Sequence, residues 1–231
     1  MAEKKLTILE RWGITAEELT ELVDNNGSLR GMMLGYVAEP MLKKMWFEKP
    51  PAMYLGKHDD HNRMKKGDLF VSYKGHEFDV ESKSLQTKMN RRDGSVWRGQ
   101  AQVDGSDRRI ITMPDGSKLD TTLLLYGEFD ILAVNVFSFE NTWRFVFAKN
   151  EDLPHSTETR YTEEQRRHLI KSMVHVSWPP EGIFRDEPFS LMDEIIAARM
   201  RNPKPPKLVV EKAAKGKNKK TTDTSQVKLI D

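Results

Sequence analysis

The stretch Gly67–Ser84, GDLFVSYKGHEFDVESKS, constrains the fold of this chain more than any other segment. Its first half, Leu69–Tyr73, consists mainly of residues that favour extended backbone, and Phe78 and Val80 supply the same property to its second half. Between them, Lys74-Gly75-His76 has the composition of a tight turn. The sequence therefore predicts a two-stranded antiparallel hairpin over this stretch.

The second arm of this hairpin carries charges where a core-covering strand would carry apolar residues. Side chains alternate between the faces of a strand, so Asp79, Glu81 and Lys83 share one face. Carboxylates beside an ammonium group suit a divalent cation next to a charge-stabilising or proton-handling residue. Asp68, at the start of the first arm, can approach Glu81 across the hairpin as a second metal ligand. The alternative is an exposed, solvated strand face.

The spacing of Asp68 and Glu81-Ser82-Lys83 resembles the motif of the PD-(D/E)XK nuclease superfamily, which includes many restriction endonucleases. Gly67 stands where that family usually has a proline. The resemblance implies a Mg²⁺ site, in which Mn²⁺ substitutes, formed by Asp68 and Glu81 with help from the Ser82 carbonyl. It implies that Lys83 orients or deprotonates the attacking water, or stabilises charge on the phosphate.

The expected order of elements agrees with this resemblance. A helix is expected before the hairpin, at Ser28–Trp46. After the hairpin, the sequence predicts a third strand at Val96–Val103, a short helix at Asp120–Tyr126, and two apolar strands at Phe129–Phe137 and Thr142–Ala148. This order resembles the restriction-endonuclease-like αβββαβ core over residues 28–148. The expected fold class is therefore α/β, with a central mixed sheet flanked by helices.

The helix expected at Ser28–Trp46 has a wide apolar stripe, which predicts that it packs in the core. The stripe consists of Leu29, Met32, Met33, Tyr36, Val37 and Met41. Gly31 and Gly35 leave a bare strip that would allow close packing against a neighbour. Pro40 is expected to bend or divide the helix.

Glu39 is an acid within the apolar segment of this helix, where an unpaired carboxylate is costly to bury. In the nuclease superfamily, an acid on the first core helix often faces the metal. The resemblance therefore implies that Glu39 is a further or water-mediated metal ligand. The alternative is an exposed helix residue beside Pro40.

A basic segment follows the hairpin. Residues 83–109 have a local charge of +4 and include a predicted strand. Basic residues just downstream of a metal hairpin suit a groove that holds DNA phosphates, and glutamines on the strand could contact the scissile phosphate or its water. The alternative is a solvated hairpin face. The DNA-binding candidates are Lys88, Arg91, Arg92, Arg98, Gln100, Gln102, Arg108 and Arg109.

The run from Lys57 to Asn62 contains His58 and His61 with two aspartates. It could bind a metal or contact a phosphate, but its spacing matches no familiar helical or strand ligand pair. A polar loop is the alternative.

Composition and charge divide the chain into a body and a tail. The chain has 231 residues, of which 38% are hydrophobic and 31% charged, which suits one globular domain of moderate size plus a tail. The resemblance implies that residues 1–200 are a single nuclease-like domain. Two capped helices are expected within 162–200, at Thr162–Val174 and Ser190–Met200. Residues 201–220 have a charge of +7 and predict a disordered basic tail over 201–231, whereas 1–200 has −4. Binding to nucleic acid must therefore depend on local patches.

Further features concern location and partners. The chain has no cysteine, no apolar run long enough to span a bilayer and no signal-peptide core at its start, which together suit the cytoplasm. The resemblance implies a type II restriction endonuclease that cuts double-stranded DNA as a homodimer. A structure-specific repair nuclease and a non-catalytic DNA-binding protein are the alternatives.

Overall fold

The computed structural model describes residues 5–57, 67–202 and 209–212. The helices are α1 (Ile8–Trp12), α2 (Ala16–Asn25), α3 (Gly27–Leu42), α4 (Phe137–Glu140), α5 (Glu163–His168) and α6 (Phe189–Arg201), with a π-helical turn at Lys43–Phe47 and short 3₁₀ turns at Thr87–Met89 and Asn150–Asp152. The strands are β1 (Ala52–Gly56), β2 (Leu69–Tyr73), β3 (His76–Ser84), β4 (Arg91–Asp93), β5 (Val96–Gln102), β6 (Asp104–Thr112), β7 (Lys118–Leu123), β8 (Ile131–Asn135), β9 (Phe145–Lys149), β10 (Met173–Trp178) and β11 (Val209–Lys212).

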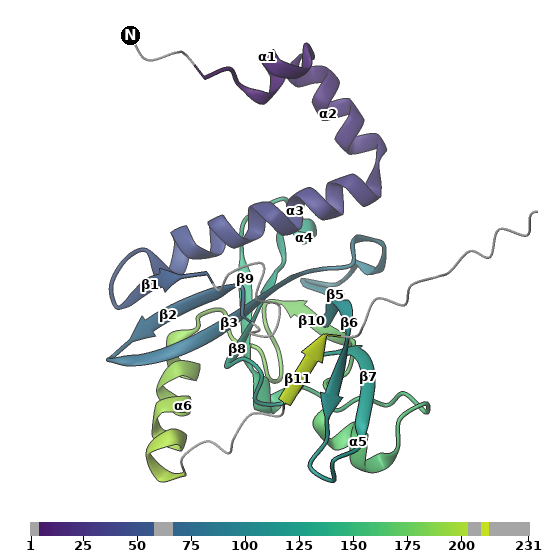
Figure 1. The fold of residues 1–231 in the computed structure, drawn as a ribbon. Helices are drawn as coiled ribbons and strands as arrows, with labels where there is room; N and C mark the ends of the chain where they lie inside the picture. The colour runs from purple at the N-terminus through teal and green to yellow at the C-terminus, as the bar shows by residue number, and fades with distance from the viewer. Residues whose placement is uncertain (1–4, 58–66, 203–208, 213–231) are drawn as a thin grey trace, which may run out of the picture.

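A mixed five-stranded sheet flanked by helices forms the centre of the molecule (Figure 1). Its strand order is β1-β2-β3-β8-β9. The first three strands form an antiparallel meander, β8 runs parallel to β3, and β9 returns antiparallel to β8. The α/β class and the central mixed sheet expected from the sequence are therefore confirmed.

The two faces of the central sheet have different coverings. On one face, Val80 and Ile131 belong to the same apolar cluster as Leu42 of α3 and Met192 of α6. On the other face, Leu132 joins a second cluster with residues of β5 and β10. The alternation along β8 divides Ile131 and Leu132 between these clusters, as period-two geometry requires. Every residue of β8 is therefore buried, whereas Met53 and Leu55 of β1, at the sheet edge, are exposed.

The expected hairpin is confirmed, but the strand beside it was not expected. Leu69 pairs with Val80 and Tyr73 with His76, so the turn lies at Lys74-Gly75. The meander is completed by β1, a five-residue strand that precedes the hairpin and pairs with β2. The expected third strand, 96–103, forms β5 instead in a separate sheet of order β10-β5-β4. Propensity located this strand but could not determine its partner.

Two helices expected from the sequence are wrong over all or part of their length. The residues expected as a helix at 120–126 mostly belong to β7, where Leu119, Thr121 and Leu123 alternate inward. The helix expected over 162–174 keeps its Thr162 cap but ends at His168, and the chain then enters β10. Tertiary pairing overrides local helical preference in both segments. The helix expected at 190–200 is confirmed as α6.

The N-terminal arm, defined here as residues 5–37, stands apart from the body (Figure 1). It contains α1, α2 and most of α3, and none of its residues is buried. The first buried residue of α3 is Ala38, and the helix continues through Pro40 to Leu42. The core packing expected for the apolar stripe of this helix is therefore wrong over Met32–Val37. The bare strip of Gly31 and Gly35 likewise meets no neighbour within 4 Å.

Part of the expected disordered tail is ordered. Val209–Lys212 forms β11, which pairs antiparallel with β6 and extends the β6-β7 hairpin into a three-stranded sheet. Residues 213–231 lie outside the described part of the chain. No helix in the described residues is long and apolar enough to cross a bilayer.

Candidate active site

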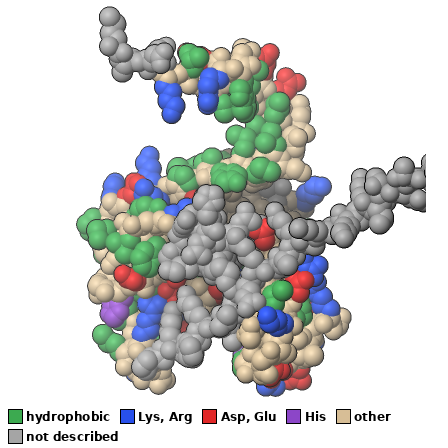
Figure 2. Space-filling model, viewed as in Figure 1, with side chains coloured by type: hydrophobic (Ala, Val, Ile, Leu, Met, Phe, Trp, Pro, Cys, Tyr) green, Lys and Arg blue, Asp and Glu red, His purple; other side chains and the backbone are tan. Residues whose placement is uncertain are grey.

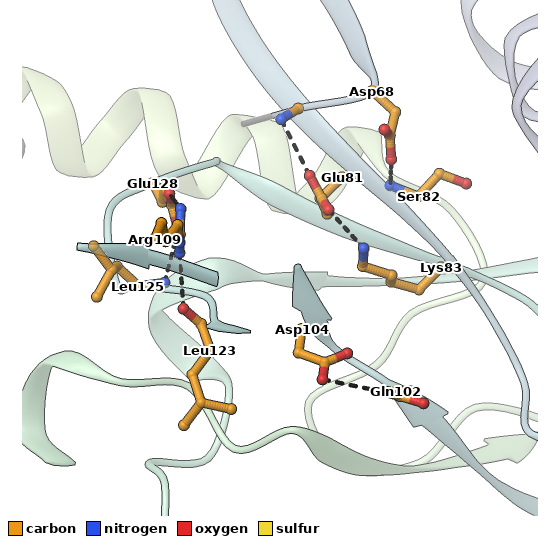
Figure 3. A network of polar contacts seen from close by, with 11 residues as sticks. Asp68, Glu81, Ser82, Lys83, Gln102, Asp104, Arg109, Leu123, Leu125 and Glu128 are labelled. Atoms are coloured by element: carbon orange, nitrogen blue, oxygen red, sulfur yellow. Dashed lines mark hydrogen bonds and ion pairs between the residues drawn. The ribbon is translucent and has the colours of Figure 1, made fainter. Parts of the chain in front are cut away.

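Asp68 is positioned by the first residues of the hairpin. Its backbone N–H donates to the Val80 carbonyl at 2.8 Å, which extends the β2–β3 ladder by one residue. Its side-chain Oδ2 accepts a hydrogen bond from the Ser82 N–H, also at 2.8 Å (Figure 3). The carboxylate of one strand is thus attached to the backbone of the next, in the direction of Glu81.

Glu81 lies on β3 and is only 4% exposed. Its Oε2 accepts a hydrogen bond from the Gly67 N–H at 3.1 Å, and its Oε1 lies 2.8 Å from Lys83 Nζ. Gly67 has a φ of +118°, and a Cβ there would lie 3.0 Å from the Cβ of Asp79. A proline has no N–H to donate and cannot adopt this φ. The backbone at this position therefore requires glycine and excludes proline.

Lys83 lies on the same face of β3 as Glu81, as the alternation predicts. Its side chain is 20% exposed. Burial lowers the pKa of the Lys83 ammonium. The Glu81 carboxylate, which also bonds to the ammonium, and the Asp68 and Asp104 carboxylates raise it, and their combined effect is larger than that of burial, so the pKa is raised. The group therefore keeps its positive charge at neutral pH.

Glu39 reaches this cluster from α3. Its Oε2 pairs with Lys57 Nζ at 2.9 Å, just beyond the end of β1. It also lies close enough to Asp68 to contribute to the raised pKa of that carboxyl. The structure therefore brings Glu39, which is distant in the sequence, near Asp68 of the hairpin that also carries Glu81 and Lys83.

Asp104, which sequence reasoning missed as a site residue, lies at the start of β6 near Lys83 (Figure 3). Its Oδ2 accepts a hydrogen bond from Gln102 Nε2 at 3.0 Å, and Gln102 in turn accepts one from Gln86 at 2.6 Å. The carboxylate contributes to the raised pKa of Lys83. The only available signal was its position two residues after Gln102, since nothing in the sequence places β6 beside β3.

The Asp68 carboxyl group, beside the Glu81 carboxylate, has a strongly shifted pKa. The pKa of Asp68 is raised to about 7, mainly by burial and next by the neighbouring Glu81 carboxylate, while Lys83 and the Ser82 N–H oppose the shift. Burial is thus the main cause of the shift, and the positive charge of Lys83 does not offset it. A divalent cation would supply further positive charge beside the carboxyl group.

The donor set fits a hard cation such as Mg²⁺. The ion prefers carboxylate oxygens and retains several water ligands, so two carboxylates and a substrate phosphate are sufficient. Asp68 and Glu81 provide these oxygens from adjacent strands, and Glu39 lies near them. No group of three or more His, Asp or Glu residues in the described part of the chain forms a ready cage for a metal.

The DNA-binding candidates differ in exposure and in their contacts. Lys88, Arg91 and Arg92 are exposed around the short β4–β5 hairpin, where Arg92 Nε donates to the Gly94 carbonyl at 3.2 Å, and Arg108 is exposed on β6. Arg98 forms an ion pair with Glu181 at 2.7 Å, and Arg108 one with Asp120 at 3.1 Å. The two glutamines share a face of β5, where Gln100 approaches His175 and Gln102 bonds to Asp104.

Arg109 does not lie on a DNA-binding surface. It is 5% exposed, and its guanidinium forms an ion pair with the buried carboxylate of Glu128, with Nη2 at 2.7 Å from Oε2. The same Nη2 donates to the Leu123 carbonyl at 2.8 Å. The expectation that Arg109 contacts DNA is therefore corrected, because all of this bonding lies inside the protein. Positive charge in the sequence did not distinguish a surface cation from a buried one.

His58 and His61 lie outside the described residues, so the structure adds nothing to their interpretation. Comparison with known proteins found no family model, no curated protein and no solved structure that matches this chain.

Proposed function

We propose that this protein is a Mg²⁺-dependent endonuclease that hydrolyses phosphodiester bonds of double-stranded DNA. The observation that carries the proposal is the convergence of Asp68 and Glu81 from adjacent strands, with Lys83 2.8 Å from Glu81. Burying two carboxylates and an ammonium group together costs folding free energy, so such a cluster is better explained by a function than by a contribution to stability. Perturbed ionisable groups of this kind gather at functional sites.

The connectivity around the site supports a restriction-endonuclease-like core. A helix, α3, precedes an antiparallel meander of β1, β2 and β3, and β8 then joins the third strand in parallel. This matches the αβββαβ arrangement except in the connection from β3 to β8. In this chain that connection contains strands β4–β7 in place of a helix.

Asp68 and Glu81 would hold the cation, with Glu39 as a further or water-mediated ligand. When bound, such an ion lowers the pKa of a coordinated water and neutralises charge on the scissile phosphate. The Ser82 and Gly67 amides fix the two carboxylates by donating to one oxygen of each, Asp68 Oδ2 and Glu81 Oε2. This preorganisation keeps the ligands in place before substrate arrives.

Lys83 would stabilise negative charge on the phosphate. The raised pKa of its ammonium keeps it protonated at neutral pH, which favours this role over that of a general base. Asp104 would act as a positioning residue, because its carboxylate lies on the opposite side of Lys83 from Glu81 (Figure 3).

DNA would be held by the exposed cations that follow the site in the chain. Lys88, Arg91 and Arg92 lie around the β4–β5 hairpin, and β5 is joined to the end of β3 by the bridge between Leu85 and Ala101. Contacts of this kind to phosphate fix the position of the duplex. Base recognition by the same region would make the enzyme a sequence-specific, type II restriction endonuclease, expected to act as a homodimer.

The test is incubation of the purified protein with plasmid and phage DNA in the presence of Mg²⁺, with Mn²⁺ in parallel. Discrete fragments are expected from the wild type. Asp68→Ala, Glu81→Ala and Lys83→Ala should each lower cleavage by at least about 100-fold, because each removes a metal ligand or a charge that acts on the phosphate. DNA binding should change little. Because removing one member of the buried Glu81–Lys83 pair also affects stability, the unfolding transition of each variant is measured and cleavage is compared per folded molecule.

Glu77→Ala provides the matched control, since Glu77 is an exposed acid on the same strand and the same face, four residues before Glu81. Its cleavage rate should equal that of the wild type. Wild-type activity in Glu81→Ala would contradict the proposal. Cleavage restricted to branched substrates would indicate a structure-specific repair nuclease, and metal-independent binding without cleavage a DNA-binding protein.

A further inference from the structure

The N-terminal arm carries most of the exposed large apolar side chains of the described chain. Eight of the thirteen lie within residues 5–37, including Tyr36, which is 72% exposed. The eight are Leu6, Ile8, Trp12, Leu22, Met32, Met33, Tyr36 and Val37. Figure 2 shows apolar side chains along the arm and along α3. Single exposed apolar residues are ordinary, but a concentration of this kind marks an interaction surface.

The sequence of the arm specifies helices, but these helices are only marginally stable without packing against a partner. Thr7 with Glu10 and Thr15 with Glu18 form complete capping boxes, so the sequence specifies both helix starts. Yet α1 has 5 residues and α2 has 10, and neither buries a side chain. Helices of this length are marginal in water without packing. A partner that covered the arm would therefore stabilise its helices.

The same conclusion follows from α3, which is apolar on two opposite sides. Ala38 and Leu42 pack on the central sheet, one turn apart. Met32, Met33 and Tyr36 project from the other side, at spacings of three and four residues, and are exposed. A helix that is apolar on both sides is normally covered on both. The three-and-four spacing fits another helix of similar character.

We propose that the arm is a self-association surface, covered by the arm of a second copy of this chain. The second copy brings what the surface requires: an apolar helical stripe of equal length, related by a two-fold axis that makes the contact self-complementary. The eight side chains expose on the order of 800 Å², about what one partner contributes to a standard interface. The proposal locates on the arm the homodimer expected under the proposed function, but its observations and its test do not depend on nuclease activity.

The charge of the arm disfavours nucleic acid as its occupant. Residues 5–37 contain three basic side chains against five acidic ones, a net charge of −2. A phosphate backbone or an anionic lipid surface requires a positive excess. A nearly neutral, apolar helical surface instead suits a protein partner with the same character.

The experiment is sedimentation velocity on the full-length protein over micromolar concentrations. The wild type should reach twice the 26.7 kDa mass of one chain. The double variant Met33→Glu/Tyr36→Glu, and separately Trp12→Glu, should raise the dimer dissociation constant at least about 100-fold, because each places a charge in an apolar contact. Since these side chains are exposed, circular dichroism of the monomer should show a folded protein.

Met200→Glu is the matched control, because Met200 is an exposed methionine on α6, outside the arm. It should leave the dissociation constant unchanged. A wild type that is monomeric at every concentration overturns the proposal. So does a dimer that Met33→Glu/Tyr36→Glu leaves intact, or one that Met200→Glu weakens equally.

Discussion

At the scale of single residues, the site depends on backbone amides as much as on side chains. Asp68 and Glu81 each have one oxygen fixed by a main-chain N–H, from Ser82 and Gly67 respectively. These donors belong to the hairpin itself, so the geometry of the turn and ladder determines where the acids point. Two predictions follow at this scale, one for a carboxyl group and one for a glycine.

The first concerns the pH dependence of stability without metal. Asp68 titrates with a pKa of about 7 in the folded protein against a usual value of 3.8, so the folded state binds its proton more tightly. Stability should therefore fall as pH rises from about 4 to 7, by at most about 4 kcal/mol. Asp68→Asn should lack this loss, as measured by urea unfolding in chelator at about pH 5 and about pH 8.

Added Mg²⁺ should restore the wild type at the higher pH, because an ion that binds only the folded state stabilises it. The same addition should have much less effect on Asp68→Asn. An equal stability difference between the two proteins at both pH values would contradict the assignment of this dependence to Asp68.

The second concerns Gly67, whose φ of +118° strains any residue with a Cβ. Gly67→Ala should cost about 1–3 kcal/mol in unfolding free energy and also displace the amide that holds Glu81, so cleavage should fall. Gly75→Ala is the control, since Gly75 also has a positive φ but its added Cβ meets nothing within 4 Å. That variant should lose stability while keeping its cleavage rate per folded molecule.

At the scale of elements, one buried ion pair connects β6 to the segment before β8. Arg109 on β6 pairs with Glu128, and the Glu128 carboxylate also accepts the Leu125 N–H at 2.8 Å. Both charges are buried, so each is costly without the other. The pair therefore fixes the β6–β7 hairpin against the body, beside the start of β6 that carries Asp104.

Arg109→Met should lower the free energy of unfolding by about 3–5 kcal/mol, because it leaves the Glu128 carboxylate buried and unpaired. The double variant Arg109→Met/Glu128→Leu should recover most of this loss. Chemical denaturation of the four proteins forms a double-mutant cycle. If Arg109 contacted DNA phosphates instead, Arg109→Met would mainly reduce the salt dependence of DNA binding and leave stability unchanged.

At the scale of the whole molecule, the chain divides into a packed body and an N-terminal arm that contributes nothing buried to it. A protein that begins at Gly27 should therefore fold with an unfolding free energy within about 1 kcal/mol of the monomeric full-length chain. The measurement is thermal or urea unfolding at concentrations where both proteins are monomeric. A large destabilisation would mean that α1 and α2 pack on the body, which the structure excludes for the described residues.

The sequence by itself determined the hairpin over 67–84, the alternation that puts Glu81 and Lys83 on one face, and the capped start of α5. These features depend on local backbone preference and on period-two geometry, which operate over a few residues. The approach of Asp68 to Glu81 was also predictable, because a tight hairpin permits few registers.

Only the tertiary structure decided which strands are neighbours and which charges are buried. It placed β1 rather than β5 beside the hairpin, put Asp104 next to Lys83, buried Arg109 against Glu128, and exposed the apolar stripe of α3. Each depends on contacts between segments distant in the chain, and local propensity carries no information about them. Strand pairing and burial follow from the packing of the whole chain, which no short stretch of sequence contains.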